Sequence, residues 1–449
     1  MENFRLANLT HVSLKSLPIR VRLLVGLAFA FTVFHFVVTT QSVRLANSDD
    51  TVCQQIASAG EIVRYFTDAS QSQGRFYYAT PLYQVPWLLY SIESPVGFAM
   101  ARATLFFVAV VLLGCWLAQL THSAAWAMLY GLVAVAALHL PPQFYPVLSY
   151  PNISLGFIAL LGAMLAQANY ARDGSFVAGL ASGACFLAAC LLCEVFIVYA
   201  PFVILQAWRD ESPRGRLFLR RSLPIVAGVI GYVAVYALFA STFKSTYSGT
   251  RFSVNISDAL LCLWRQTAAC VPGFELLAKR TVMGAPGPFW RQPAEVLHLF
   301  RDLPFASLAL VVLQVCATAV LLDRISRESV AVSRRVLVLA VALVVLPNLP
   351  ISLTARYQVT AHQRMYPYVY SYYAYLALVF LVLACWHRLT VIRPGWRWRR
   401  AWVCAGVALA ALLDLSAQAA NRKTLAFLVT GSSESTPVAS APSNHAVGK

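Results

Sequence analysis

Two adjacent carboxylates are the residues of this sequence with the clearest chemical potential. Asp49 and Asp50 follow shortly after an apolar run at 21–40. Neighbouring carboxylates repel each other, and a bound cation or an accepted proton relieves that repulsion. The pair therefore suits a general base, alone or with a divalent cation such as Mg²⁺ or Mn²⁺ held by both acids.

The same acids also fit the N-terminus of a helix, where Asp is a favoured cap. Thr51 and Gln54 already have the spacing of a capping box, which predicts a helix that begins after Thr51. Two further acids are more than such a cap requires. We therefore favour catalysis over capping for Asp49 and Asp50.

Further candidates for binding a substrate lie in other parts of the chain. Arg75 and Tyr77 stand in a Gly-Arg-aromatic stretch, which suits a phosphate head group at a membrane surface but also a solvated turn. Glu194 lies in an apolar run, where a charge costs about 2.5–3.5 kcal/mol at the middle of a helix. It could bind a sugar hydroxyl or a metal, or be a neutral side chain that hydrogen-bonds between helices.

A basic loop precedes one of the later apolar runs. Arg356, His362 and Arg364 lie in the segment 354–367, just before or within a stretch rich in tyrosine. Two arginines and a histidine could bind a lipid phosphate or pyrophosphate. The tyrosines are more typical of an aromatic belt at a membrane interface.

The composition places these candidates in a membrane protein. Of 449 residues, 59% are hydrophobic and 12% are charged, whereas soluble domains carry roughly 25% charged residues. The mean hydropathy of +0.65 agrees. These values exclude a soluble enzyme, a disordered protein and a nucleic-acid-binding domain. The net charge of +17 is an orientation signal and does not indicate a nucleic-acid partner.

Apolar runs long enough to cross a bilayer, which takes about 20 residues, predict an all-α polytopic bundle. Nine runs are clear, at 21–40, 99–119, 124–140, 152–169, 223–241, 304–322, 336–353, 368–386 and 401–418. A tenth, 175–206, would form a single helix of roughly 48 Å. If it instead forms a hairpin that turns near 190–194, the basic clusters at 1–22 and 207–222 both stay inside. We therefore expect about eleven spans, with one long tilted helix as the alternative.

This topology predicts a cytoplasmic N-terminus, a periplasmic C-terminus and two long outward-facing loops. Loop 41–97 holds Val52, Ile56, Ala59, Val63 and Phe66 at helical spacing, which predicts one amphipathic helix lying on the membrane surface. A second helix is expected from 81 to 89. Loop 242–303 contains apolar clusters near 260 and 297 that predict two more. We expect one transmembrane domain, 1–430, and a disordered tail, 431–449, rich in Ser, Pro and Ala.

Other chemistry finds little support in the sequence. Nucleotide-binding and hydrolase motifs and zinc-ligand spacings are absent. Cys262 and Cys270 are about 12 Å apart if they lie on one helix, which is too far for a disulfide. Whether they pair is left open. Gly179 and Gly183 form a small-residue pair that predicts close helix packing.

The order of features over residues 40–95 resembles the GT-C class of membrane glycosyltransferases. An apolar run, two acids, an interfacial helix, a Gly-Arg-aromatic stretch and a Pro-Leu-aromatic helix follow one another. Lipid A aminoarabinose transferases, protein mannosyltransferases and O-antigen glucosyltransferases share this layout. The resemblance implies a polyprenyl-phosphate-linked sugar as donor and Asp49 as the base, with Asp50 as its neighbour. One departure is that no sizeable soluble domain is expected after the last span.

The sequence thus predicts an inner-membrane glycosyltransferase that moves a sugar to an outward-facing lipid, glycan or protein acceptor. An O-antigen polymerase or ligase would share the many spans and the outward arginines, but would not need Asp50. A transporter or flippase for a lipid-linked sugar predicts ionisable residues along a midplane path. A scaffold subunit would use Asp49 and Asp50 only as caps.

Overall fold

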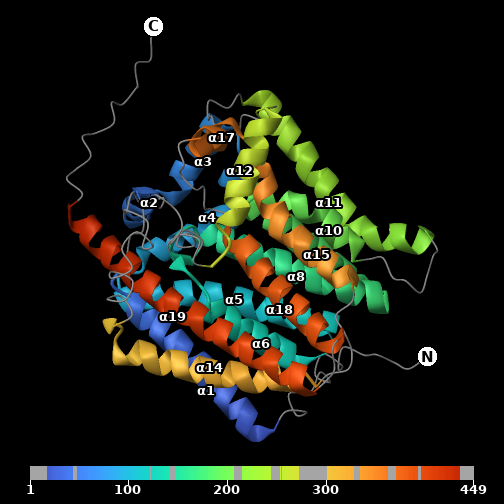
Figure 1. Cartoon of the computed structure of the whole chain (residues 1–449). Coiled ribbons are helices and arrows are strands. Elements are labelled where there is room, and N and C mark those ends of the chain that lie inside the picture. Colours follow the sequence, from blue (N-terminus) through green and yellow to red (C-terminus); the bar gives the residue numbers. More distant parts are fainter. Residues whose placement is uncertain are drawn as a thin grey trace.

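The computed structural model describes residues 18–43, 48–121, 123–140, 147–206, 215–243, 253, 255–272, 301–327, 334–362, 371–392 and 396–434. Every multi-residue element over these residues is a helix. Figure 1 shows long helices that pack side by side, with several short helices gathered at the upper end of the bundle.

Seven of the described helices are long and apolar enough to cross a membrane. They are α1 (Ile19–Thr40), α5 (Pro95–Thr121), α8 (Pro151–Asp173), α11 (Gly215–Thr242), α14 (Phe305–Ile325), α18 (Ser371–Ile392) and α19 (Trp396–Glu434). Their length and apolar composition confirm the prediction of a polytopic helical membrane protein.

Shorter apolar helical segments lie between the long helices. They are α6 (Ala124–Ala136), α9 (Phe176–Leu192), η5 with α10 (Glu194–Tyr199 and Ala200–Leu205), and α15, η9 and α16 (Arg334–Val345, Leu346–Asn348 and Leu349–Ser352). Each coincides with an apolar run in the sequence. Several are interrupted by 3₁₀ turns, some of them at prolines, which cannot donate a backbone hydrogen bond to the helix.

The run 175–206 forms two segments, as the charge pattern predicts. The backbone is extended at Cys193 (φ −159°, ψ 120°), so α9 ends there and η5 begins. The carbonyl of Leu192 accepts a hydrogen bond from Asn152 in the first turn of α8 (3.1 Å). Gln206 instead accepts one from Trp116, near the end of α5 (3.1 Å). The chain therefore turns back after Cys193 and does not continue as one long helix.

Close packing at Gly179 and Gly183 holds α9 between its neighbours. A Cβ at Gly179 would meet the ring of Tyr170 on α8 at 3.1 Å. A Cβ at Gly183 would meet the carbonyl oxygen of Pro224 on α11 at 2.9 Å. The two glycines thus admit two different helices, and the prediction of close packing is confirmed.

Replacing Gly183 by Ala is expected to destabilise the bundle by about 1–3 kcal/mol, because α11 must move away from α9. The measurement is the melting temperature of the detergent-solubilised protein. Gly231→Ala on α11 is the matched control, since nothing lies within 4 Å of its added Cβ. Equal melting temperatures for the two variants would contradict the prediction.

The segment after α1 differs from the single surface helix that its apolar spacing predicts. It forms α2 (Ser48–Ser58) and α3 (Ile62–Gln73), separated at Gly60, which adopts a left-handed conformation (φ 72°). Val52 in α2 and Val63 in α3, both in the predicted stripe, are exposed. Phe66 is buried as predicted, and the other buried positions are Cys53, Ala57, Ile62 and Ser70.

The remaining short helices agree with the sequence in part. A 3₁₀ turn η3 (Phe76–Ala79), α4 (Pro81–Gln84) and η4 (Val85–Ser91) follow α3. The expected helix near 260 is α12 (Ile256–Ala268), whereas the one near 297 lies outside the described residues. Helix α19 extends to Glu434, four residues into the expected tail, because helix propagation adds a hydrogen bond per residue. Residues 435–449 lie outside the description.

Candidate functional site

Asp50 is buried in the first turn of α2, with 1% of its surface exposed. Its Oδ1 accepts hydrogen bonds from the hydroxyls of Tyr90 in η4 and Ser149 just before α8. The donors come from segments 40 and 99 residues away in the sequence. These two hydrogen bonds hold the Asp50 carboxyl group in a fixed position.

Asp49 differs from its neighbour because its side chain is exposed. Its Oδ2 accepts a hydrogen bond from the hydroxyl of Tyr150. The consecutive residues Ser149 and Tyr150 thus hold the consecutive residues Asp50 and Asp49. The result is one anchored acid beside one accessible acid, which is the arrangement that a positioned general base requires.

Tyr150 has an unusual backbone. Among the described residues it is the one non-glycine residue with a positive φ (49°), and α8 begins immediately after it. A left-handed conformation costs a residue with a Cβ of order 1–3 kcal/mol and persists only when surrounding contacts maintain it. Here those contacts include the bond to Asp49 and packing of the Tyr150 ring against Trp87, with centroids 6.1 Å apart.

The predicted capping box is wrong. Helix α2 begins at Ser48, so Thr51 lies inside the helix and both acids lie in the first turn. Negative side chains in a first turn interact favourably with the helix dipole, typically by 0.3–1 kcal/mol. Asp49 and Asp50 therefore stabilise the start of α2, in addition to any chemistry of the exposed carboxylate.

The interior behind the acids is aromatic and buried. Trp87 stacks on Tyr90 (centroids 6.0 Å apart) and contacts Tyr83 (6.2 Å). Burial raises the pKa of the Cys53 thiol, and the nearby negative charges of Asp50 and Asp49 raise it further. Burial likewise raises the pKa of Tyr90, again with Asp50 adding to the effect. Cys53 and Tyr90 therefore stay protonated, and Tyr90 remains a hydrogen-bond donor to Asp50.

A second cluster joins three of the residues expected to bind a substrate. The Arg75 guanidinium forms an ion pair with Glu194 (Nη2 to Oε1, 3.0 Å), and the Tyr77 hydroxyl donates to Glu194 Oε2 (2.8 Å). Arg75 also donates to the hydroxyl of Tyr78 (2.7 Å). Burial opposes the charge of Arg75, but Tyr77 and Glu194 outweigh it and raise the pKa of Arg75. The guanidinium is therefore always charged.

The two clusters share one aromatic layer. Tyr77 contacts Tyr83 with ring centroids 5.4 Å apart, and Tyr83 contacts Trp87, which packs on Tyr90. The ring contacts therefore run from Tyr77, which bonds Glu194, to Tyr90, which bonds Asp50. Sequence reasoning selected the two acids, Arg75, Tyr77 and Glu194, but it missed their partners Tyr78, Tyr90, Ser149 and Tyr150.

Removing Glu194 is expected to destabilise the protein. In Glu194→Ala the guanidinium of Arg75 and the buried hydroxyl of Tyr77 both lose an acceptor, which costs about 3 kcal/mol or somewhat less, because the pair is partly exposed. The measurement is thermal unfolding in detergent. The double variant Arg75→Met/Glu194→Met removes both charges and should melt above the single variant. A single variant as stable as the wild type would contradict this expectation.

Arg102 is a residue that the sequence analysis did not select as a candidate. It is 4% exposed and donates to the carbonyls of Thr40 (3.0 Å), Val43 (2.7 Å) and Leu148 (3.1 Å). It thereby ties the end of α1 to the residue preceding Ser149. A small void of about 10 Å³ lined by Arg102 and Ser149 has room for about one water molecule. The signal that could have revealed Arg102 is a charge inside an apolar run.

The other predicted residues are not placed at either cluster. Helix α17 (Ala355–His362) contains the backbone of Arg356 and His362 and packs against α12. The side chains of these two residues, and all of Arg364, lie outside the described part of the chain. A role for them in phosphate binding stays a prediction.

Metal binding was also expected at the two acids. Within the described ranges, no group of three or more His, Cys, Asp or Glu side chains comes together. Asp50 already accepts two hydroxyl hydrogen bonds, whereas Asp49 is the more accessible oxygen ligand. A metal held by both acids therefore stays a prediction, and the reaction proposed for this site uses protein side chains.

Comparisons with known proteins give no relative. No family model, no curated protein and no solved structure matches this chain. The resemblance to GT-C enzymes therefore rests on the sequence of segment 40–95 alone.

Proposed function

We propose that this protein is an integral membrane glycosyltransferase that moves a sugar from a polyprenyl-phosphate donor to an outward-facing acceptor. The observation that carries the proposal is the pair of acids after the first span. Asp49 is exposed and oriented by Tyr150, while Asp50 is buried and anchored by Tyr90 and Ser149. An exposed acid beside a buried, anchored acid suits a general base and the residue that positions it.

The proposed topology has eleven spans. Seven long apolar helices support it, and the proposal takes the four shorter apolar segments as further crossings. With the basic clusters inside, the N-terminus is cytoplasmic, the C-terminus is periplasmic and α2 and α3 lie on the outer surface of the inner membrane. The site then faces a compartment that lacks nucleotide sugars, which is consistent with a lipid-linked donor.

The proposed reaction is a single displacement at the anomeric carbon. Asp49 takes the proton of the acceptor hydroxyl, and the acceptor oxygen forms a bond to the anomeric carbon. The bond from that carbon to the phosphate oxygen breaks, and the polyprenyl phosphate leaves with the electron pair. Cationic side chains stabilise the leaving phosphate, for which Arg75, Arg356, His362 and Arg364 are the proposed candidates, beside Tyr77 and Glu194 as contacts to the sugar.

The test is transfer in proteoliposomes that contain the purified protein. A panel of undecaprenyl-phosphate-linked hexoses, aminosugars and pentoses is supplied with a lipid extract as acceptor. Mass spectrometry then follows released undecaprenyl phosphate and the glycosylated product. Equal amounts of both products support the proposal. Passage of a labelled lipid-linked sugar across the bilayer without covalent transfer would indicate a flippase instead.

A further inference from the structure

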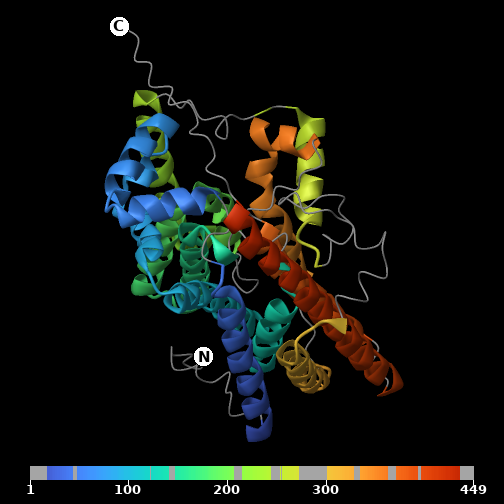
Figure 2. The same cartoon turned by 90° about the vertical axis from the view of Figure 1, so that its left-hand side faces the viewer.

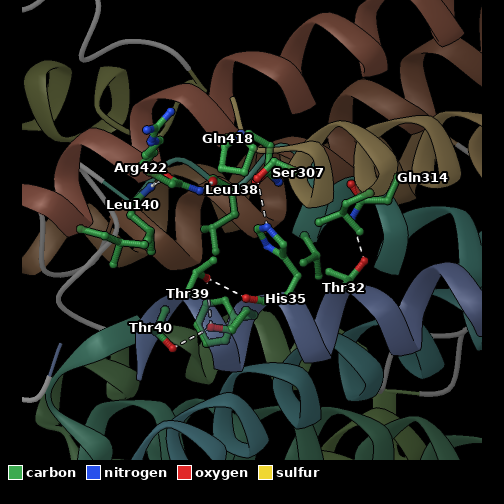
Figure 3. A pocket seen from close by; sticks show the side chains of 16 residues that line it. Thr32, His35, Thr39, Thr40, Leu138, Leu140, Ser307, Gln314, Gln418 and Arg422 are labelled. Carbon is green, nitrogen blue, oxygen red and sulfur yellow. Dashed lines mark hydrogen bonds between the residues drawn. The ribbon is translucent and has the colours of Figure 1, made fainter. Parts of the chain in front are cut away.

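A cavity of about 230 Å³ lies apart from both clusters, between α1, the end of α6, α14 and α19. Figure 3 shows its polar side chains converging from α1 on one side and from α14 and α19 on the other. Its polar lining includes His35, Thr39 and Ser307, and its apolar lining includes Phe36, Leu310 and Leu425. The cavity therefore combines a polar side with an apolar side.

The polar wall is held by hydrogen bonds between helices. His35 on α1 bonds Ser307 on α14 (3.1 Å), and Gln314 donates to Thr32 (2.8 Å). Asn421 on α19 accepts from the backbone N–H of Leu140 (2.6 Å), and its amide donates to the Leu138 carbonyl. These bonds join four segments around the cavity, so its shape is preformed.

The cavity is lined by a positively charged side chain. Among the described lining residues, Arg422 is the one with a permanent charge, and none of them carries a carboxylate. Its side chain is exposed and one of its N–H groups donates to the backbone carbonyl of Asp302. A guanidinium carries five N–H donors in a planar fork that fits phosphate oxygens. The positive charge of Arg422 therefore favours an anion at this cavity.

The position of the cavity on the bundle points to a ligand from the bilayer. In α1 and α19, only 22% of the residues in the most apolar stretch are buried inside the protein. Both helices lie on the outside of the bundle in Figures 1 and 2. Phe36, Leu310 and Leu425 supply an apolar surface for hydrocarbon. A lipid could thus reach the cavity laterally with its head group toward Arg422.

We infer that this cavity binds the phosphate end of a membrane lipid. The phosphate pairs with Arg422, side-chain amides of the polar wall donate to its remaining oxygens, since each amide carries two N–H groups, and the first methylene groups pack on the apolar wall. The site is linked to the acid pair through Arg102, which binds the carbonyl of Thr40 in the cavity wall and that of Leu148 beside Ser149.

The test measures binding of farnesyl phosphate to the full chain in nanodiscs of uncharged lipid. Farnesol, inorganic phosphate and phosphatidylglycerol are the other probes. Arg422→Gln is expected to weaken binding of farnesyl phosphate at least tenfold, the effect of losing a charged hydrogen bond, and to leave farnesol unaffected. Thr39→Phe, which fills the cavity, should weaken both. Arg301→Gln is the matched control, since Arg301 is exposed nearby but does not line the cavity.

The outcomes separate the sources of the phosphate. Competition by phosphatidylglycerol supports a general lipid-phosphate site, and its absence supports a prenyl phosphate site. Equal binding of farnesol and farnesyl phosphate, or equal competition by inorganic phosphate, would overturn the inference. So would an unchanged affinity in Arg422→Gln. The choice of a prenyl probe rests on the proposed function, but binding is measured without turnover. Asp49→Asn should still bind, so loss of transfer and loss of binding are distinguishable.

Discussion

Asp49→Asn is expected to lower kcat/KM for glycosyl transfer by about 10²–10⁴, the usual contribution of a general base. The amide cannot accept the proton of the acceptor hydroxyl. Asparagine keeps an oxygen that can accept the Tyr150 hydrogen bond, so the geometry of the site is retained. The variant should therefore melt close to the wild type and still bind donor. The measurement is initial transfer rate against donor concentration in proteoliposomes.

Asp68→Asn is the matched control for this experiment. Asp68 is an exposed carboxylate on α3, in the same outward segment. Asp68→Asn removes one negative charge from the same surface. A general electrostatic effect on an anionic donor would therefore change the transfer rate equally in both variants. Full transfer activity in Asp49→Asn, or equal losses in both variants, would remove the assignment of Asp49 as the base.

Asp50→Ala is instead expected to lower the stability of the folded protein. The hydroxyls of Tyr90 and Ser149 would lose their common buried acceptor, and each such loss costs about 1–3 kcal/mol. Asp50→Asn keeps one acceptor oxygen and is expected to be less destabilised. Thermal unfolding of the three proteins in detergent measures the order wild type, Asn and Ala. Because Asp50 anchors α2, transfer activity should fall together with stability in both variants.

Reactivity of the Cys53 thiol is a local measure of whether α2 is released in Asp50→Ala. In the wild type its thiol is buried and its pKa is raised by burial and by the two acids, so it should resist alkylation. Release of α2 in Asp50→Ala would expose Cys53 and increase its labelling, read from the peptide that contains it by mass spectrometry. An Asp50→Ala protein with wild-type melting and a protected Cys53 would show that Asp50 does not anchor this helix.

The membrane helices were predictable because their signal is local. A run of about 20 apolar residues is a property of consecutive side chains, and such runs coincide with α1, α5, α8 and α14. The turn after Leu192 was also predictable, because a single helix would have placed two basic clusters on opposite sides. Both inferences need no knowledge of which helices touch.

The local pattern did not predict how α2 and α3 are arranged. The apolar spacing from Val52 to Phe66 continues across Gly60, and nothing in that spacing indicates a change of direction. The left-handed conformation of Gly60 is selected when α2 and α3 pack separately on the aromatic layer of Tyr83 and Trp87. The predicted start of α2 was wrong for a similar reason. The hydrogen bond from Tyr90 to Asp50 favours a helix that begins earlier, and the local sequence does not show this contact.

The sequence alone marks Asp49, Asp50, Arg75, Tyr77 and Glu194 as candidates, because their residue types can do chemistry where they stand. Their partners are not evident from it, because Glu194 and Tyr77 are 117 residues apart and Ser149 is 99 residues from Asp50. Hydrogen bonds over such separations depend on how the helices pack, which no local pattern encodes. Sequence therefore identified the chemical groups and the membrane segments, whereas packing assigned the exposed acid, the buried acid and the ion pair.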